Sequence, residues 1–403
     1  MSDFHQGGVI TTLHRLGAGN LDALEGDLEK SASIRPVALV LPCLASEFDT
    51  ASISRILEEL HQVRYLEEIV VALGRADEER FVAARKRFQQ LSTRSTVVWM
   101  DSPHTQALLG EMEQRGLAVD QDGKGRSAWM AYGYLLGRAQ CDVIALHDAD
   151  ILTYRRDLLA RLVYPVANPR LGFDFCKGYY SRVTDKLHGR ATRLLMTPLI
   201  RALGRVIGDE RPFLTFVDSF RYPLAGEFAM AADLARVNRI PGDWGLEVGT
   251  LAEVYRNVAP GRVCQSDLAD VYEHKHQALS PDDPGKGLMR MAVDITRSLL
   301  RTLAEEGVPI SDALLKSLPV TYTRVAHEMM ARYENDAQIN SLLFDAHEEG
   351  QAVEAFARAI RLASDAYLAD PVGQPLIPSW NRVLAALPDM LDRLVAAVDR
   401  DNL

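Results

Sequence analysis

The chain has 403 residues, of which 47% are hydrophobic and 25% are charged, so it can bury a large core. A formal net charge of −10 excludes broad neutralisation of nucleic-acid phosphates, and we expect no nucleic-acid partner. No segment has the pattern of a signal peptide or a membrane span, so we expect a cytoplasmic protein that does not bind a membrane. An acidic chain that binds an anionic substrate must gather its Lys and Arg residues locally or use a metal ion.

Strand and helix patterns alternate in the first 150 residues. Leucines at helical spacing predict a short helix over residues 20–30. The predicted strands cover residues 37–42, 66–73, 96–100 and 143–146, and Pro42 is expected to end the first of them. The helices predicted between them cover residues 51–63, 76–91, 105–115 and 127–138. This alternation predicts an α/β fold with a mostly parallel sheet and helices on both faces.

The pattern changes in the second half of the chain. Shorter extended and helical segments occupy residues 171–280, and a cluster of Pro, Asp and Gly follows at 280–287. Beyond this cluster apolar residues recur at helical spacing over residues 288–303, 320–333, 352–368 and 380–398. We therefore predict three regions: an N-terminal arm at 1–35, an α/β domain at 36–280 whose nucleotide half extends to about 150, and a helical C-terminal extension at 281–403.

Two carboxylates, Asp148 and Asp150, follow the predicted strand at 143–146 with only Ala149 between them. In open α/β sheets, ligands bind at the carboxyl ends of the strands. Mg²⁺ takes one or two protein carboxylates and completes its shell with water and substrate phosphate oxygens. By itself this common pattern favours a solvated acidic turn, and the other motifs of the chain favour a cation site for a phosphorylated substrate.

Two short segments carry candidate anion-binding side chains. In Gly123-Lys124-Gly125 the glycines would let the backbone approach a ligand while the ammonium reaches a phosphate, although the spacing is not that of a P-loop. In Gly189-Arg190-Ala191-Thr192 the polar side chains begin a predicted helix, where a phosphate or carboxylate would bind. A solvated helix face explains the second segment equally well. His274 is a candidate further metal ligand, because neutral imidazole binds divalent ions.

Seven segments occur in order between residues 36 and 280. They are Pro42–Glu47, Gly123–Gly125, Asp148–Asp150, Gly189–Thr192, Pro223–Glu227, Trp244–Glu247 and His274. Together they resemble the retaining glycosyltransferases that make glucosyl-3-phosphoglycerate, with the mannosyl-3-phosphoglycerate synthases as close relatives. The resemblance implies a GT-A fold, with a Rossmann-like sheet, as the catalytic domain at 36–280.

The resemblance also implies a role for each candidate residue. At the nucleotide, Pro42, Leu44 and Glu47 would bind the base and ribose, and Lys124 the uridine or diphosphate. At the sugar side, Asp148 and Ala149 would bind the ribose and sugar, and Glu247 and Trp244 the sugar. Asp150 and His274 would hold Mg²⁺ (or Mn²⁺). The acceptor would be bound by Gly189, Arg190, Thr192 and His276. Leu224 would present its backbone carbonyl near the anomeric centre. With the roles given above for Asp150 and Glu247, the candidate catalytic residues are Leu224, Asp150 and Glu247.

The implied reaction moves glucose or mannose from UDP-glucose or GDP-mannose to 3-phosphoglycerate for compatible-solute synthesis. No side chain is an obvious nucleophile, so front-face substitution with retention is expected. Two alternatives stay open: a synthase that uses glycerate directly (glucosylglycerate or mannosylglycerate synthase), and a non-catalytic nucleotide-sugar-binding protein. The apolar helix faces after Pro281 must be covered, either by the α/β domain or by a second copy, and the resemblance implies a homodimer.

Overall fold

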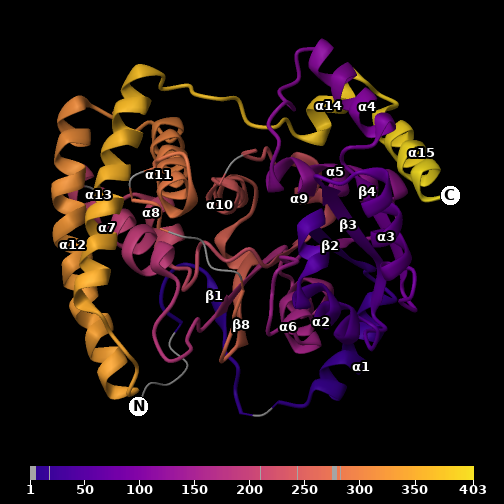
Figure 1. Cartoon of the computed structure of the whole chain (residues 1–403), viewed down its shortest axis with the longest axis horizontal. Coiled ribbons are helices and arrows are strands. Elements are labelled where there is room, and N and C mark those ends of the chain that lie inside the picture. Colours follow the sequence, from indigo (N-terminus) through magenta and orange to yellow (C-terminus); the bar gives the residue numbers. More distant parts are fainter. Residues whose placement is uncertain (1–5, 18, 209, 243, 275–278, 282) are drawn as a thin grey trace.

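The computed structural model describes residues 6–17, 19–208, 210–242, 244–274, 279–281 and 283–403. In this part of the chain eight strands form one sheet in the order β1-β8-β6-β7-β5-β2-β3-β4 (Figure 1). The strands are β1 (Thr11–Leu13), β2 (Val37–Leu44), β3 (Leu66–Gly74), β4 (Arg94–Trp99), β5 (Val143–Leu146), β6 (Phe175–Tyr180), β7 (Phe228–Ala231) and β8 (Val263–Ala269). All neighbours are parallel except β7, which is antiparallel to β5 and β6. The predicted α/β fold with a mostly parallel sheet is confirmed.

Helices cover both faces of this sheet. The helices of the first half are α1 (Leu21–Ala32), α2 (Ala51–Leu60), α3 (Glu78–Phe88), α4 (Pro103–Gln114), α5 (Lys124–Arg138) and α6 (Arg156–Ala167). Helix α5 packs on β2 and β3, whereas α6 packs on β5 to β8. Along β2, Ala38 and Val40 face the core shared with α5, and Leu39 and Leu41 face the core shared with α6. The strands are therefore buried on both faces, which explains their continuous apolar runs.

The prediction that Pro42 ends the first strand is wrong. Strand β2 continues to Leu44 and pairs with β3 over its whole length, with Pro42 opposite Ala72. Its other neighbour, β5, ends at Leu146 opposite Val40. A proline lacks only the backbone N–H, and this loss is tolerated where one neighbouring strand has already ended.

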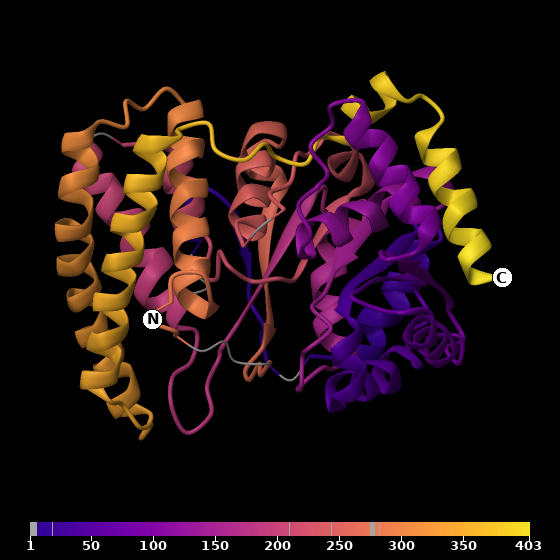
Figure 2. The ribbon, with the colours of Figure 1, turned by 45° about the horizontal axis from the view of Figure 1, so that its top comes forward.

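The second half forms a helical bundle beside the sheet. The helical elements of this half include the π-helical segment η2 (Ala191–Met196), α7 (Thr197–Ile207), α8 (Pro212–Asp218), α9 (Ala232–Val237), α10 (Leu246–Asn257), α11 (Gly287–Glu305), α12 (Asp312–Ile339), α13 (Ala346–Ala369), α14 (Trp380–Ala386) and α15 (Met390–Asn402). The bundle itself consists of η2, α7, α8, α11, α12 and α13. Helices α7 and η2 come from the middle of the chain and pack against α12 and α13. Figure 2 shows this bundle at one side of the molecule and α14 and α15 at the other. The boundary near residue 280 stays a prediction.

The C-terminal helices α14 and α15 return to the first half of the chain. The ring of Trp380 stacks on that of Trp129 in α5, with centroids 4.2 Å apart, and its Nε1 donates to the Trp129 carbonyl oxygen at 3.1 Å. Asn402 pairs with the backbone of Val97 in β4, which is the edge strand of the sheet. The predicted single helix at 380–398 is two helices, because Leu387, which precedes Pro388, leaves the helical conformation (φ −141°, ψ 82°) and ends α14.

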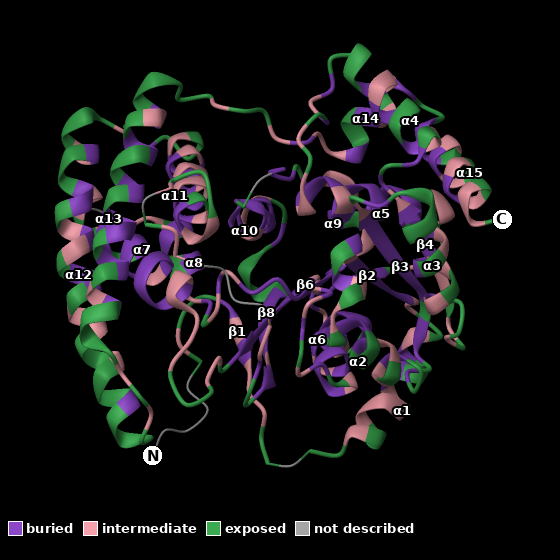
Figure 3. Ribbon diagram, in the orientation of Figure 1, coloured by how far each residue is buried: buried purple, intermediate pink, exposed green. Residues whose placement is uncertain are grey.

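The sheet is buried inside the molecule, whereas the outward face of the helical bundle is exposed to solvent. Figure 3 shows the strands mostly buried and the outward sides of α12 and α13 mostly exposed. Apolar side chains stand on these outward sides, among them Val320, which is 72% exposed, and Ile339, which is 83% exposed. Within the described residues no helix combines the length and the apolarity that crossing a bilayer requires.

Replacing Trp380 tests whether α14 stabilises the nucleotide half of the sheet. The Trp380 side chain is fully buried. Its ring occupies the space that a Cβ at position 133 would need, so only glycine fits there. We expect Trp380→Ala to lower the free energy of unfolding by about 3 to 5 kcal/mol. Urea titration measures this loss, and Val372→Ala, at a position 77% exposed, is the control with a change below about 0.5 kcal/mol. A loss below about 1 kcal/mol in Trp380→Ala would show that α14 docks without stabilising the sheet.

Candidate active site

The ends of three central strands bring the candidate residues to one edge of the sheet. Strands β2 and β5 are parallel neighbours, so Glu47 and the acidic motif Asp148–Asp150 follow them on the same side. Strand β7 runs the other way and begins with Phe228 opposite Leu146. The residues that precede β7 therefore lie beside the acidic motif. The order of the segments in the sequence does not reveal this proximity.

The ammonium of Lys124 lies between two carboxylates at this edge. Its Nζ is 2.6 Å from Asp148 Oδ1 and 3.0 Å from Glu247 Oε1. Lys124 is the first residue of α5, and Glu247 is in the first turn of α10. Although burial disfavours the charged form, the two carboxylates raise the pKa of Lys124 well above its usual value. Burial would likewise raise the pKa of Asp148, but the ammonium outweighs it and lowers that pKa. Lys124 and Asp148 are therefore both charged at neutral pH.

The glycines around Lys124 serve a different purpose from the one predicted. A Cβ on Gly125 would lie 2.2 Å from the Pro241 carbonyl oxygen, and one on Gly123 would lie 2.4 Å from that of Gly242. The glycines thus admit a crossing segment of this chain rather than a ligand. This packing fixes where α5 begins, and hence where the Lys124 side chain starts.

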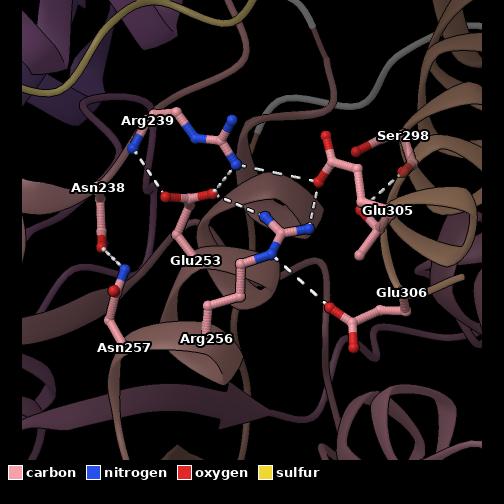
Figure 4. A network of polar contacts seen from close by, with 9 residues as sticks. Asn238, Arg239, Glu253, Arg256, Asn257, Ser298, Glu305 and Glu306 are labelled. Carbon is pink, nitrogen blue, oxygen red and sulfur yellow. Dashed lines mark hydrogen bonds and ion pairs between the residues drawn. The ribbon is translucent and has the colours of Figure 1, made fainter. Parts of the chain in front are cut away.

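A polar network holds that crossing segment in place (Figure 4). The buried carboxylate of Glu253 in α10 accepts from the backbone N–H of Arg239 at 3.1 Å and from its guanidinium at 3.0 Å. It also accepts from Arg256 at 2.7 Å, and Arg256 in turn pairs with Glu305 of α11. Arg239 lies two residues before Pro241, so this network ties the segment that crosses the glycines beside Lys124 to α11 of the helical bundle.

Asp150 and His274 form a second pair beside the first. Strand β8 leads to His274, whose backbone bridges Ile151, and its Nδ1 is 3.7 Å from Asp150 Oδ2. Among the described residues no group of three or more His, Cys, Asp or Glu side chains could hold a metal ion. One carboxylate and one imidazole fit a cation that takes its remaining ligands from water and phosphate, as Mg²⁺ and Mn²⁺ do.

Buried polar side chains support the loop that contains Leu224. The fully buried Lys177 of β6 donates to the Ala225 carbonyl oxygen at 2.7 Å, and burial lowers the pKa of Lys177 to about 8. Gly226 lies against the Asp148 carboxylate, where a Cβ would come within 2.4 Å of Oδ2. Leu224 itself is half-buried. The loop is thus held from both sides.

Glu227 ends this loop inside a cage of tyrosines. Its two carboxylate oxygens accept from Tyr180 at 2.7 Å and from Tyr272 at 2.6 Å, and the two rings stack with centroids 3.6 Å apart. Burial and the nearby charge of Asp148 raise the pKa of Glu227. Sequence reasoning missed this cage and the role of Lys177, although a lysine inside an otherwise apolar strand indicated a buried partner.

The candidate acceptor segment begins at Gly189, whose φ of +75° favours glycine. The Arg190 guanidinium lies 2.7 Å from Glu348 and 3.0 Å from Glu349, both of α13. The Thr192 side chain is buried, and its hydroxyl has no hydrogen-bond partner in the described part of the chain. His276 lies outside the described residues.

The remaining candidate residues lie in or just after β2, within the acidic motif, or just before α10. Pro42 is half-buried in β2, Leu44 is 42% exposed at its end, and Glu47 is buried in the 3-10 segment η1 (Ala45–Asp49). Ala149 is buried between the two aspartates, and Trp244 is 37% exposed just before α10. The structure thus joins Lys124, Asp148 and Glu247 directly, and Asp150 to His274, whereas Arg190 pairs with α13.

His147 precedes the acidic motif as a neutral buried ring. It is fully buried, and neither ring nitrogen has a hydrogen-bond partner among the described residues. The ring meets Tyr154 edge-on, with centroids 5.5 Å apart. Burial lowers the pKa of His147 from 6.5 to about 3.

Comparison with known proteins identifies the class of this enzyme. No protein-family model matches the chain. A glucosyl-3-phosphoglycerate synthase of Persephonella marina is 47% identical over 402 residues, which cover 100% of this chain and 99% of the relative. One of Methanococcoides burtonii is 38% identical over 404 residues, covering 99% and 98%. The chain is a glycosyltransferase. It belongs to the glucosyl-3-phosphoglycerate synthase family.

A solved structure shows the same fold. The glucosyl-3-phosphoglycerate synthase of Mycobacterium tuberculosis, in complex with Mn²⁺, UDP-glucose and phosphoglyceric acid, matches with a TM-score of 0.54 at 23% identity. The match covers 74% of this chain and 88% of that chain. At this identity the likeness supports the fold of the sheet and its helices.

Acidification should reveal the buried His147. Because the ring is neutral when folded but titrates near 6.5 when unfolded, its contribution to stability is present above pH 6.5 and is lost as the pH falls toward 3. We expect His147→Leu to reduce the loss of unfolding free energy between pH 7.5 and pH 5.0 by about 2 kcal/mol. Urea titrations of wild type and variant at both pH values measure this, and equal losses would contradict a neutral buried ring.

Proposed function

We propose that this enzyme transfers glucose from UDP-glucose to 3-phosphoglycerate with retention of the anomeric configuration, on a GT-A-type fold. The observation that carries the proposal is the Lys124 ammonium between Asp148 and Glu247, beside the Asp150–His274 pair. The names of two full-length relatives and the ligands of the Mycobacterium tuberculosis complex support glucose, UDP and phosphoglycerate over mannose, GDP and glycerate.

Charge stabilisation of the leaving nucleotide is the main chemical task. A divalent cation, Mg²⁺ or Mn²⁺, held by Asp150 and His274 would neutralise charge that develops on the departing diphosphate. Lys124 adds a positive charge whose position is set before the donor binds, because Asp148 and Glu247 already orient it. Pro42, Leu44 and Glu47 line the nucleotide side of this edge, and Ala149 and Trp244 the sugar side.

The pairing of the carboxylates supports front-face substitution. Asp148 and Glu247 both pair with Lys124, so neither is placed as a nucleophile toward the sugar. The bond from the anomeric carbon to the diphosphate breaks, and the acceptor oxygen bonds to the same face. The proton of the acceptor hydroxyl passes to the leaving phosphate oxygen. The Leu224 carbonyl, in a loop held by Lys177, orients that hydroxyl.

The acceptor is bound at the start of η2. Gly189 allows the chain to turn there, and a Cβ at that position would lie 3.3 Å from the Tyr222 hydroxyl, so the segment adjoins the Leu224 loop. Arg190 and Thr192 bind the phosphate or carboxylate of 3-phosphoglycerate, together with His276. We further propose a cytoplasmic homodimer, joined through the outward apolar side chains of the C-terminal helices, that makes a precursor of a compatible solute.

Asp150→Ala tests the cation site. We expect kcat for transfer from UDP-glucose to 3-phosphoglycerate to fall at least about 100-fold, because the divalent cation then loses its carboxylate ligand and Lys124 alone opposes charge on the leaving diphosphate. Asp142→Ala, an exposed position at the start of the same strand, is the matched control and should retain full activity. Assays with UDP-glucose and GDP-mannose against 3-phosphoglycerate and glycerate also identify the substrates. Undiminished transfer by Asp150→Ala would show that the reaction does not depend on this cation site, and it would overturn the proposal.

Arg190→Ala tests the acceptor site. The variant should raise the acceptor KM at least roughly tenfold, because a charged hydrogen bond to phosphate is lost, and should leave the donor KM within about twofold. Lys186→Ala removes an exposed cation from the preceding loop and serves as the control. Initial rates at varied donor and acceptor concentrations separate the two constants. Equal rises in both KM values would remove Arg190 from the acceptor site.

A further inference from the structure

Two adjacent glutamates of α13 meet Arg190, and they differ in burial. The Glu349 side chain is 6% exposed, whereas that of Glu348 is 47% exposed. The two glutamates lie in the first turn of a helix that follows Arg190 by more than 150 residues. The C-terminal region therefore supplies two negative charges to the candidate acceptor segment.

Glu349 joins two arginines through one carboxylate. Its Oε1 accepts from Arg190 Nε at 3.0 Å, and its Oε2 accepts from Arg193 Nη1 at 2.8 Å. Arg193 also donates to the carbonyl oxygen of His188 at 2.8 Å and lies over the Tyr333 ring at 5.0 Å. Because Arg193 is anchored by these contacts, Glu349 has a fixed place and orients the Arg190 guanidinium.

Glu348 occupies a different nitrogen of the same guanidinium. Its Oε1 lies 2.7 Å from Arg190 Nη2. Glu348 is half exposed whereas Glu349 is buried, so Glu348 is the carboxylate that an incoming anion can reach. Two arginines and two glutamates together carry no net charge, so a monoanion that replaces Glu348 gains little. A phosphate dianion carries more charge and more acceptor oxygens, and it gains more from the same exchange.

We propose that Glu349 positions Arg190 for the acceptor, while Glu348 holds the acceptor-facing nitrogen and is displaced by the acceptor's phosphate. This inference rests on the proposed function. The exchange makes Glu348 a specificity residue that favours a phosphorylated acid over glycerate. Helix α13 is then part of the acceptor site and not only part of the bundle.

Neutral variants of the two neighbours should have opposite effects. Glu348→Gln removes the competitor, so the acceptor KM should fall about threefold, and the preference for 3-phosphoglycerate over glycerate in kcat/KM should narrow roughly tenfold. Glu349→Gln releases Arg190, so the acceptor KM should rise roughly tenfold while the donor KM changes less than about twofold. Glu354→Gln, an exposed position on the same helix, is the control and should change neither constant.

The outcomes separate this inference from the proposed function. If the wild-type enzyme does not transfer glucose to 3-phosphoglycerate, the proposed function fails before any variant is compared. If it does, a Glu348→Gln variant with a raised or unchanged acceptor KM, or with an unchanged preference for the phosphorylated acceptor, overturns the inference alone. Glu349→Gln leaves two cations without their shared carboxylate, so its thermal unfolding is measured beside its kinetics. Should it not fold, Glu348→Gln alone decides between the outcomes, because that side chain is half exposed.

Discussion

The ammonium of Lys124 joins the starts of two helices to the end of a central strand. Asp148 comes from the loop after β5 and Glu247 from α10, and both contact the first residue of α5. A charge in this partly enclosed place is stable only with partners, and each partner in turn needs the ammonium. The geometry of this edge of the sheet therefore depends on three elements that meet at one point.

Those elements arrive together because parts of the chain far apart in sequence cross there. The segment after Arg239 lies against the glycines around Lys124, and Glu253 ties that segment to α10 and α11. The C-terminal region contacts the rest of the chain at two places. Helices α14 and α15 pack on α5 and the edge strand, and α13 pairs with Arg190. The helices after residue 280 thus contact both α5, which begins with Lys124, and Arg190 of the candidate acceptor segment.

The partly buried cations of the candidate sites are paired with carboxylates of the same chain. Lys124 contacts Asp148 and Glu247, and Arg190 contacts Glu348 and Glu349. Such pairs keep the cations oriented and limit the attraction of unrelated anions. At the proposed sites, binding would be an exchange of one negative group for another, in which the charge and shape of the ligand decide affinity.

The sequence alone determined the α/β class, the strand at 143–146 with its two aspartates at the carboxyl end, and the family, because apolar runs and short motifs are local properties. It did not reveal that Gly123 and Gly125 face backbone carbonyls, that Lys177 holds the Leu224 loop, or that Glu227 lies among tyrosines. It also did not connect Arg190 with α13. These relations are contacts between residues tens to hundreds of positions apart, and only the path of the chain through β7 and the returning helices brings them within hydrogen-bond distance.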